Sequence, residues 1–307
     1  MNLFLRKIFN LIENIFGYFI VFKLRKIKTD DLSILPSYNI TGSNVALILQ
    51  GPIIIENDFT YETVKYYNHL YPNLKIIIST WKGVSPILEE KFNIKNVIIL
   101  QNERPINAGN SNVNLQIKST TEALLYAKQN GAKFALKSRT DQRINSIHNY
   151  LNYMLEIIEN FPIKPNQIFQ NRLIICNLNM FKKRHYIVSD MFMFGAINDM
   201  LLYWNIPHQL EKSEYENKKS YLENNFAEAY FVNSFLDKVN YNTLGTFEDS
   251  KLFYGNYFYI LDKNVIDLFW YKYNHNYERT RVWVENQTDF PYSIIDFLPI
   301  YNESTKS

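Results

Sequence analysis

The sequence is poor in the residue types that mark disulfide-rich and loop-rich proteins, with one cysteine and nine glycines among 307 residues. A single cysteine excludes a disulfide framework and argues against a cysteine-ligated zinc site. Because Cys176 ends an apolar run, we expect a buried, inert thiol rather than a nucleophile. The chain also has no G-x-G-x-x-G, P-loop, H-E-x-x-H or G-x-S-x-G motif. A standard dinucleotide enzyme, NTPase, zincin or α/β-hydrolase is therefore disfavoured.

Most of the chain also lacks an excess of charge of either sign. The net charge is +3, but residues 1–28 alone carry +5, which leaves −2 for the remainder. We therefore expect no nucleic-acid partner, since such proteins carry a basic patch on the folded domain. Hydrophobic residues make up 47% of the chain and aromatic residues 16%, enough for the core of one large domain.

The basic N-terminal segment has the pattern of an amphipathic helix. Residues 3–24 are mostly Phe, Ile and Leu, interrupted by polar residues three or four positions apart. A membrane span requires about twenty mostly apolar residues, and Glu13 would be costly at mid-bilayer. No small-residue cleavage site follows, which disfavours a signal peptide. We expect residues 1–28 to lie on a membrane surface; packing onto the body, homo-oligomerisation and a true span are the alternatives.

The rest of the chain alternates between strand-like and helix-like segments. Residues 29–43 are predicted to be a linker, because they contain Pro36, Gly42 and Ser43. Short apolar runs then predict strands over 45–49, 75–78, 97–100 and 133–137, separated by helices over 59–70, 84–92 and 112–129. This order predicts an α/β fold with a mostly parallel, doubly wound sheet. Further helices are expected over 145–160 and 226–239, whereas the last 70 residues give no clear pattern.

The strand predicted at 133–137 leads into a carboxylate, Asp141, flanked by Arg139 and Arg143. In open α/β sheets, ligands bind outside the carboxyl ends of the strands, so charge placed there faces a substrate. The carboxylate can bind a metal or a sugar hydroxyl, and the arginines can bind phosphate. The alternative is a solvated turn with a surface ion pair.

Uncharged polar residues dominate the start of the helix predicted at 112–129, where Asn112, Gln116 and Ser119 share one face. This face suits hydrogen bonds to a base or ribose, and a helix N-terminus offers N–H groups to phosphate; ordinary capping is the alternative. Asp190 lies before an apolar run, and Glu228 follows a polar segment. Either carboxylate can accept a proton from an incoming hydroxyl group, or act only as a structural acceptor.

Several of these stretches occur together in an order that resembles the WavE-type lipopolysaccharide-biosynthesis family, whose members are regarded as bacterial glycosyltransferases of GT-A-like architecture. The resemblance extends over roughly residues 44–285. The matching stretches are ALILQGPI at 46–53, YP at 71–72 with ISTW at 78–81, NxNxQxxST at 112–120, KxRTDxR at 137–143 and SDMFxFG at 189–195. No single stretch is specific, but their ordered combination is. It implies a glycosyltransferase domain over 44–285 and a C-terminal tail over 286–307.

The resemblance implies transfer of a sugar from a nucleotide-sugar donor to a lipopolysaccharide, a lipooligosaccharide or a related glycan or glycolipid acceptor. With the settings described above, it leaves Asp141, Glu228 and Asp190 as the candidate catalytic residues. The candidate donor-binding residues are Gln50, Gly51, Pro52, Thr80, Trp81, Asn112, Gln116, Ser119, Arg139 and Arg143. Asp141 occupies the place of the acidic motif that holds Mg²⁺ or Mn²⁺ in GT-A enzymes, but one carboxylate replaces the usual two.

Two other classes of function remain open on the sequence. One is a non-catalytic nucleotide- or sugar-binding component of a glycan-assembly complex, and the other is a nucleotidyl- or phosphotransferase. A second acid beside the donor would favour an enzyme over a binding protein. We expect a cytoplasmic protein, peripheral on the inner face of the cell membrane through residues 1–28.

Overall fold

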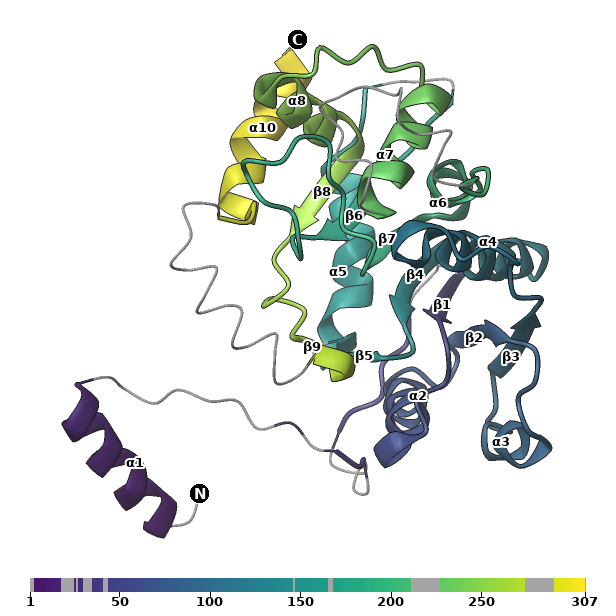
Figure 1. The fold of residues 1–307 in the computed structure, drawn as a ribbon, viewed down its shortest axis with the longest axis vertical. Helices are drawn as coiled ribbons and strands as arrows, with labels where there is room; N and C mark the ends of the chain where they lie inside the picture. The colour runs from purple at the N-terminus through teal and green to yellow at the C-terminus, as the bar shows by residue number, and fades with distance from the viewer. Residues whose placement is uncertain are drawn as a thin grey trace.

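The computed structural model describes residues 3–17, 25, 27–29, 35–40, 44–145, 147–164, 168–210, 227–273 and 290–306. Its main feature is a seven-stranded sheet in the order β3-β2-β1-β4-β7-β6-β8, surrounded by helices (Figure 1). A smaller sheet pairs β5 (Gln142–Ile144) with β9 (Leu268–Trp270) in antiparallel fashion.

One strand of the large sheet runs against all the others. The strands β1 (Val45–Gln50), β2 (Lys75–Trp81), β3 (Val97–Asn102) and β4 (Phe134–Arg139) are parallel. β7 (Met193–Ala196) is antiparallel to β4 and to β6 (Leu173–Cys176), and β6 is parallel to β8 (Phe258–Leu261). The predicted α/β class with a mostly parallel sheet is confirmed.

The parallel strands continue past their apolar runs into polar residues. All six residues of β1 are buried, as expected for a strand covered on both faces. Each of the four strands predicted from its apolar run extends further at its carboxyl end, because backbone pairing continues where the side chains become polar. The register sets Gln50 beside Ser79 on β2 and Arg139 on β4. Polar groups from three strands therefore meet at one edge of the sheet.

Helices cover the sheet and extend its core. The described helices of the body are α2 (Phe59–Leu70), α3 (Pro86–Lys91), α4 (Val113–Gln129), α5 (Ile147–Asn160), α6 (Ile197–Trp204), α7 (Ala227–Lys238), α8 (Phe247–Tyr257) and α10 (Ile294–Lys306). α4 packs across β1 to β4 and against α6, and α6 packs against α7. A cluster of aromatic rings centred on Phe235 joins α7 to α8 and β8.

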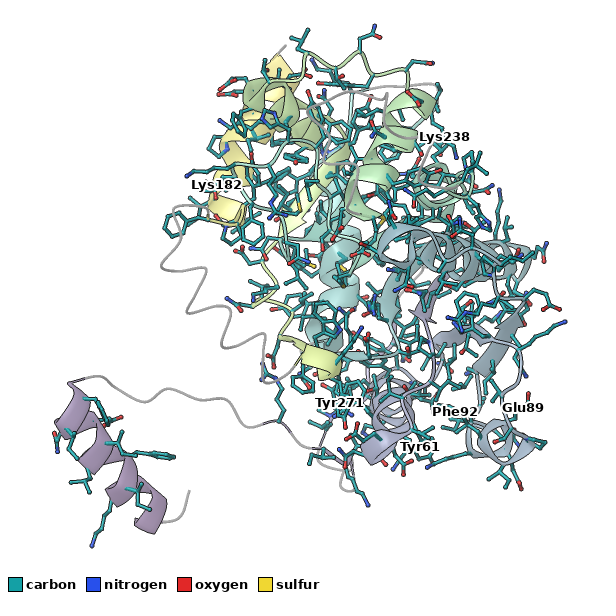
Figure 2. The ribbon with its side chains drawn as sticks, in the orientation of Figure 1. Tyr61, Glu89, Phe92, Lys182, Lys238 and Tyr271 are labelled. Atoms are coloured by element: carbon teal, nitrogen blue, oxygen red, sulfur yellow. The ribbon has the colours of Figure 1, made fainter. Side chains whose placement is uncertain are left out.

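Segments at both ends of the chain contact this body. The C-terminal helix α10 packs against α8, and Lys182 forms an ion pair with Asp296 of α10 at 2.6 Å (Figure 2). Within the segment predicted to be a linker, the Tyr38 N–H donates to the Leu70 carbonyl at 2.6 Å. The Thr29 N–H donates to the buried Glu62 carboxylate at 2.7 Å, which fixes Thr29 against α2.

The N-terminal segment contains the helix α1 (Leu3–Phe16), which Figure 1 draws away from the body. Its large apolar side chains are exposed, with Leu11 at 62%, Ile15 at 66% and Phe16 at 67%. None of the helices that the structure describes combines the length and the hydropathy needed to span a membrane.

Candidate functional site

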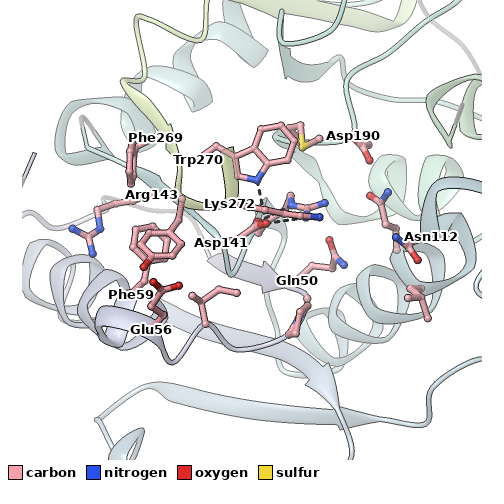
Figure 3. A pocket seen from close by; sticks show the side chains of 18 of the residues that line it. Gln50, Glu56, Phe59, Asn112, Asp141, Arg143, Asp190, Phe269, Trp270 and Lys272 are labelled. Carbon is pink, nitrogen blue, oxygen red and sulfur yellow. Dashed lines mark hydrogen bonds and ion pairs between the residues drawn. The ribbon is translucent and has the colours of Figure 1, made fainter. Parts of the chain in front are cut away.

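A cavity of about 1230 Å³ opens at the carboxyl ends of β1 and β4 (Figure 3). Ligand pockets typically measure about 300–1,000 Å³, so this cavity can hold more than one small substrate. It gathers most of the side chains selected from the sequence: Gln50, Gly51, Pro52, Trp81, Asn112, Gln116, Arg139, Asp141, Arg143, Asp190 and Glu228. Six separate segments of the chain therefore contribute to one space.

Asp141 lies at the centre of the labelled side chains in Figure 3 and is held by two cationic or polar neighbours. Arg139 donates from Nε to Oδ1 at 2.8 Å and from Nη2 to Oδ2 at 3.0 Å, and Trp270 donates from Nε1 to Oδ2 at 3.1 Å. Burial acts to raise the pKa of the Asp141 carboxyl, but Arg139, Trp270 and Lys272 together outweigh it and lower the pKa. Asp141 is therefore a carboxylate at neutral pH.

The sequence places Asp141 between two arginines, but Arg139 alone of the two pairs with it in the structure. Arg143 extends to the opposite end of the group from Asp190 in Figure 3 and donates from Nε to Thr63 Oγ1 at 3.0 Å. Its guanidinium lies 4.9 Å from the centre of the Phe59 ring. Arg139 ends β4 whereas Arg143 lies within β5, so the two side chains reach different parts of the cavity.

The turn after β1 is fixed against the Asp141 segment. Gly51 has φ +123°, a conformation that side-chain-bearing residues rarely adopt, and a Cβ there would lie 3.0 Å from Thr140 Oγ1. Thr140 Oγ1 donates to the Pro52 carbonyl at 2.6 Å, and the Thr140 N–H donates to the Gln50 carbonyl at 3.1 Å. Glycine at position 51 thus lets the two loops approach closely.

Two carboxylates, Asp190 and Glu228, come together on the side of the cavity nearest α4 and α7. Asp190 is 2% exposed, and its Oδ1 has no hydrogen-bond partner among the described residues. Burial, together with the negative charge of Asp190, raises the pKa of Glu228 to about 7, although Arg184 and Asn179 act in the opposite direction. A carboxyl group with this pKa can exchange a proton near neutral pH. The polar segment before Glu228 lies outside the described residues over 211–226.

Two of the predicted donor-binding residues lie beneath the cavity rather than in its lining. Thr80 is 3% exposed on β2. Ser119 is 0% exposed; its Oγ donates to the Leu115 carbonyl at 2.7 Å, and its own carbonyl accepts from Ser79 Oγ at 2.6 Å. The helical spacing that grouped Ser119 with Asn112 and Gln116 did not reveal that this part of α4 faces the sheet.

Gln50 and Gln116 leave buried acceptors in the cavity wall. Each side chain is 5% exposed, and each has an Oε1 atom without a hydrogen-bond partner among the described residues. With Asp190 Oδ1, these atoms form a set of buried acceptors that a ligand rich in hydroxyl groups would satisfy. A buried polar atom left unpaired costs about 1–3 kcal/mol, so such a ligand gains affinity by pairing it.

The sequence did not single out Trp270, Lys272, Arg104 or Arg25, which also line the cavity. Trp270 reaches Asp141 because β9 pairs with β5, with Gln142 opposite Trp270. The only sequence signal was the richness of the C-terminal region in Tyr and Trp, which specifies no pairing partner. Arg25 comes from the N-terminal segment and forms an ion pair with Asp267 at 3.0 Å.

The donor set does not fit a divalent metal ion. Across the residues that the structure describes, no three His, Cys, Asp or Glu side chains are grouped to hold one. Both oxygens of Asp141 already accept hydrogen bonds from Arg139. Divalent cations of this type prefer several oxygen ligands, and a single engaged carboxylate supplies too few.

Comparison with known proteins gives one match to a family. No curated protein matches the chain. The model of the family described as WavE lipopolysaccharide synthesis matches residues 45–236. The matched region begins with β1 and ends within α7, so it contains Asp141, Asp190 and Glu228. The chain belongs to the WavE lipopolysaccharide synthesis family.

Proposed function

We propose that this protein is a glycosyltransferase that moves a sugar from a nucleotide-sugar donor to a lipopolysaccharide, a lipooligosaccharide or a related surface glycan. The observation that carries the proposal is the shared cavity of Asp141, with its lowered pKa, and Glu228, with its pKa of about 7. Carboxyl groups whose pKa values are pushed apart take different roles in catalysis. Family membership and the position of the cavity at the strand ends support the proposal, and they are in keeping with GT-A-like architecture.

The donor is proposed to lie along the ends of β1 and β2. Its nucleotide would contact the Gln50–Pro52 turn, Trp81 and the start of α4. Its diphosphate would face Arg139 and Lys272, since guanidinium and ammonium groups bind phosphate oxygens strongly. These cations would offset the charge that develops on the leaving diphosphate.

The sugar and the acceptor are proposed to occupy the end of the cavity that holds Gln50, Gln116 and Asp190. The unpaired buried oxygens there match the hydroxyl groups of a sugar. The acceptor hydroxyl oxygen attacks the anomeric carbon, the bond from that carbon to the diphosphate oxygen breaks, and the diphosphate leaves with the electron pair. Glu228, assisted by Asp190, takes the hydroxyl proton. This sequence of events inverts the configuration of the sugar.

The membrane role of the N-terminal segment is part of the same proposal. We place residues 1–28 on the cytoplasmic surface of the cell membrane, where a lipid-linked acceptor lies. The exposed apolar residues Leu11, Ile15 and Phe16 and the surplus of basic residues support this placement. Arg25 and Ile27 of this segment line the cavity, so a docked segment would hold the site beside the lipid surface.

A thermal-shift screen against UDP-, GDP- and CMP-sugars, with and without Mn²⁺, followed by a turnover assay with the best donor, tests the function. We expect Glu228→Gln to bind the donor normally and to lose turnover. Glu248→Gln is the matched control, because Glu248 also lies in the first turn of a helix but is exposed on α8. Donor binding without turnover in the wild-type protein would favour a non-catalytic binding protein. Cleavage within the diphosphate would favour a nucleotidyltransferase.

A further inference from the structure

Lys137 is a charged residue at the centre of the large sheet. Its side chain is 0% exposed, and β4 holds it between Ile48 of β1 and Met193 of β7. Burial of an ammonium group is unfavourable unless nearby groups compensate the lost hydration. A methionine or leucine would fill the same space without that cost, so the lysine requires a specific explanation.

The partners of Lys137 connect it to the carboxylate pair of the site. Lys137 Nζ donates a hydrogen bond to the main-chain carbonyl of Asp190. The same Nζ lies 4.5 Å from the centre of the Trp204 ring, whose Nε1 donates to Met193 Sδ at 3.2 Å. The ammonium group is thus fixed between an aromatic face and the backbone of the residue that carries one of the carboxylates.

We infer that Lys137 is a positioning residue, which holds Asp190 beside Glu228 and supplies the positive charge that keeps this carboxylate pair ionised and thus available as a base. The inference rests on the proposed function, because it assigns Lys137 to the same proton transfer. The charge acts through Asp190 rather than by contact with substrate, since Lys137 lies behind the wall of the cavity. It therefore affects the charge state of the pair without touching the reacting atoms.

The surroundings of Lys137 bring the pKa of its ammonium group close to neutral pH. Burial lowers the pKa of Lys137 to about 8, and Arg139 acts in the same direction. Asp190, Asp141 and Cys176 face the ammonium group and partly oppose the effect of burial. The positive charge is consequently present at pH 7 and is lost above about pH 8.

Groups from several elements affect the pKa of Glu228. Asp190 lies before β7, Arg184 lies in the preceding loop, and Tyr203 on α6 also interacts electrostatically with Glu228. Removal of a nearby positive charge makes a carboxyl group harder to ionise, so loss of the Lys137 charge is expected to raise the pKa of Glu228.

The experiment titrates the full-length protein by NMR, with ¹³C-labelled glutamate and lysine, in the wild type, Lys137→Met, Lys137→Arg and the control Lys133→Met. Lys133 precedes β4 and its side chain is exposed. Glu228→Gln identifies the Glu228 signal. We expect the Glu228 midpoint to rise in Lys137→Met and to stay unchanged in Lys137→Arg and Lys133→Met. An unchanged midpoint in folded Lys137→Met overturns the inference.

A kinetic profile separates positioning from a purely structural role. With the donor that gives the largest thermal shift, we expect the wild-type rate to rise near pH 7 and the rise in Lys137→Met to move to higher pH. Lys137→Arg should retain turnover and the wild-type profile, because arginine stays charged. If Glu228→Gln is inactive but Lys137→Met keeps the wild-type profile, only the inference about Lys137 fails. If Glu228→Gln and Asp190→Asn both keep normal turnover, the proposed function itself fails.

Discussion

At the scale of single residues, chemically similar side chains in the site have different neighbours and therefore different properties. Asp141 is buried and Glu228 is half-buried, yet Arg139 outweighs burial and lowers the pKa of the first, whereas burial and Asp190 raise that of the second. Arg139 and Arg143 are likewise similar, but one pairs with Asp141 and the other packs on Phe59 beside Thr63. Each member of these pairs is expected to respond differently to substitution.

Asp141→Asn is expected to keep the fold and to reduce transfer about ten- to a hundredfold. The amide keeps the shape of the side chain but loses the charge-assisted pair with Arg139, which contributes about 1.5–3 kcal/mol. Turnover and the thermal midpoint should be measured on the same preparation. Wild-type transfer by the folded variant would leave Asp141 with only a structural role in the turn.

Arg139→Ala is expected to weaken the binding of the nucleotide-sugar by about 1.5–3 kcal/mol, because it removes a cation that we propose to contact the donor phosphate. Isothermal titration calorimetry on this variant and on Arg143→Ala measures the contribution of each arginine. Lys133→Ala is the control, since it removes an exposed positive charge away from the cavity. The double variant Arg139→Ala/Asp141→Asn separates the lost phosphate contact from the effect of an unpaired Asp141. Unchanged affinity for both arginine variants would contradict a phosphate role.

At the scale of secondary-structure elements, the first half of the sheet and the helix α4 follow from the sequence. The short, continuous apolar runs that begin at Val45, Ile76 and Val97 are typical of parallel strands; β1 and the middle of β2 are buried, whereas β3, at the edge of the sheet, is mostly half-buried. Asp141 was identified because it follows such a run, Asp190 because it precedes one, and Glu228 because it follows a polar segment at the start of a predicted helix. Trp270 and Lys272 could not be found in this way, because β9 has only three residues and its partner lies far away in the chain.

The turn between β1 and α2 gives a prediction at this scale. Gly51→Ala is expected to destabilise the protein by about 1–3 kcal/mol and to weaken donor binding, because the turn must change its conformation. Gly83→Ala is the matched control: Gly83 also has positive φ, at +99°, but its added Cβ would meet no atom within 4 Å. The difference in free energy of unfolding between the two variants, from urea titrations, isolates the contact with Thr140. Equal losses would mean that this contact is unimportant.

At the scale of the whole molecule, the protein combines an α/β body with a helix whose apolar side chains are exposed. The body buries its apolar residues in one continuous core. In α1, by contrast, Leu11, Ile15 and Phe16 are more than half exposed. Such a helix gains stability when its apolar side enters a membrane interface. Thr29, bound to Glu62, fixes the chain between this helix and the cavity to the body.

The full-length protein is expected to sediment with anionic phosphatidylglycerol vesicles, and binding should weaken in high salt. Each basic residue near the surface contributes about 1 kcal/mol, whereas the apolar contribution is insensitive to salt. Leu11→Asp/Ile15→Asp should abolish most of the binding. Ile87→Asp, at an apolar residue on α3 that is 81% exposed, should leave it intact. Equal sedimentation of all variants would assign residues 1–28 a packing role.

The hydrogen bond from Trp270 to Asp141 joins residues that are 129 positions apart, and this separation has a consequence during synthesis on the ribosome. At about 5–20 residues per second, Asp141 emerges roughly 6–26 s before the indole that completes its surroundings. The strands β1 to β4 can pair during that interval, but the pocket wall made by β9 does not yet exist. A nascent chain arrested before β9 would therefore present the strand-end edge of its cavity without the Trp270 and Lys272 side chains, so the complete site forms only when translation is nearly finished.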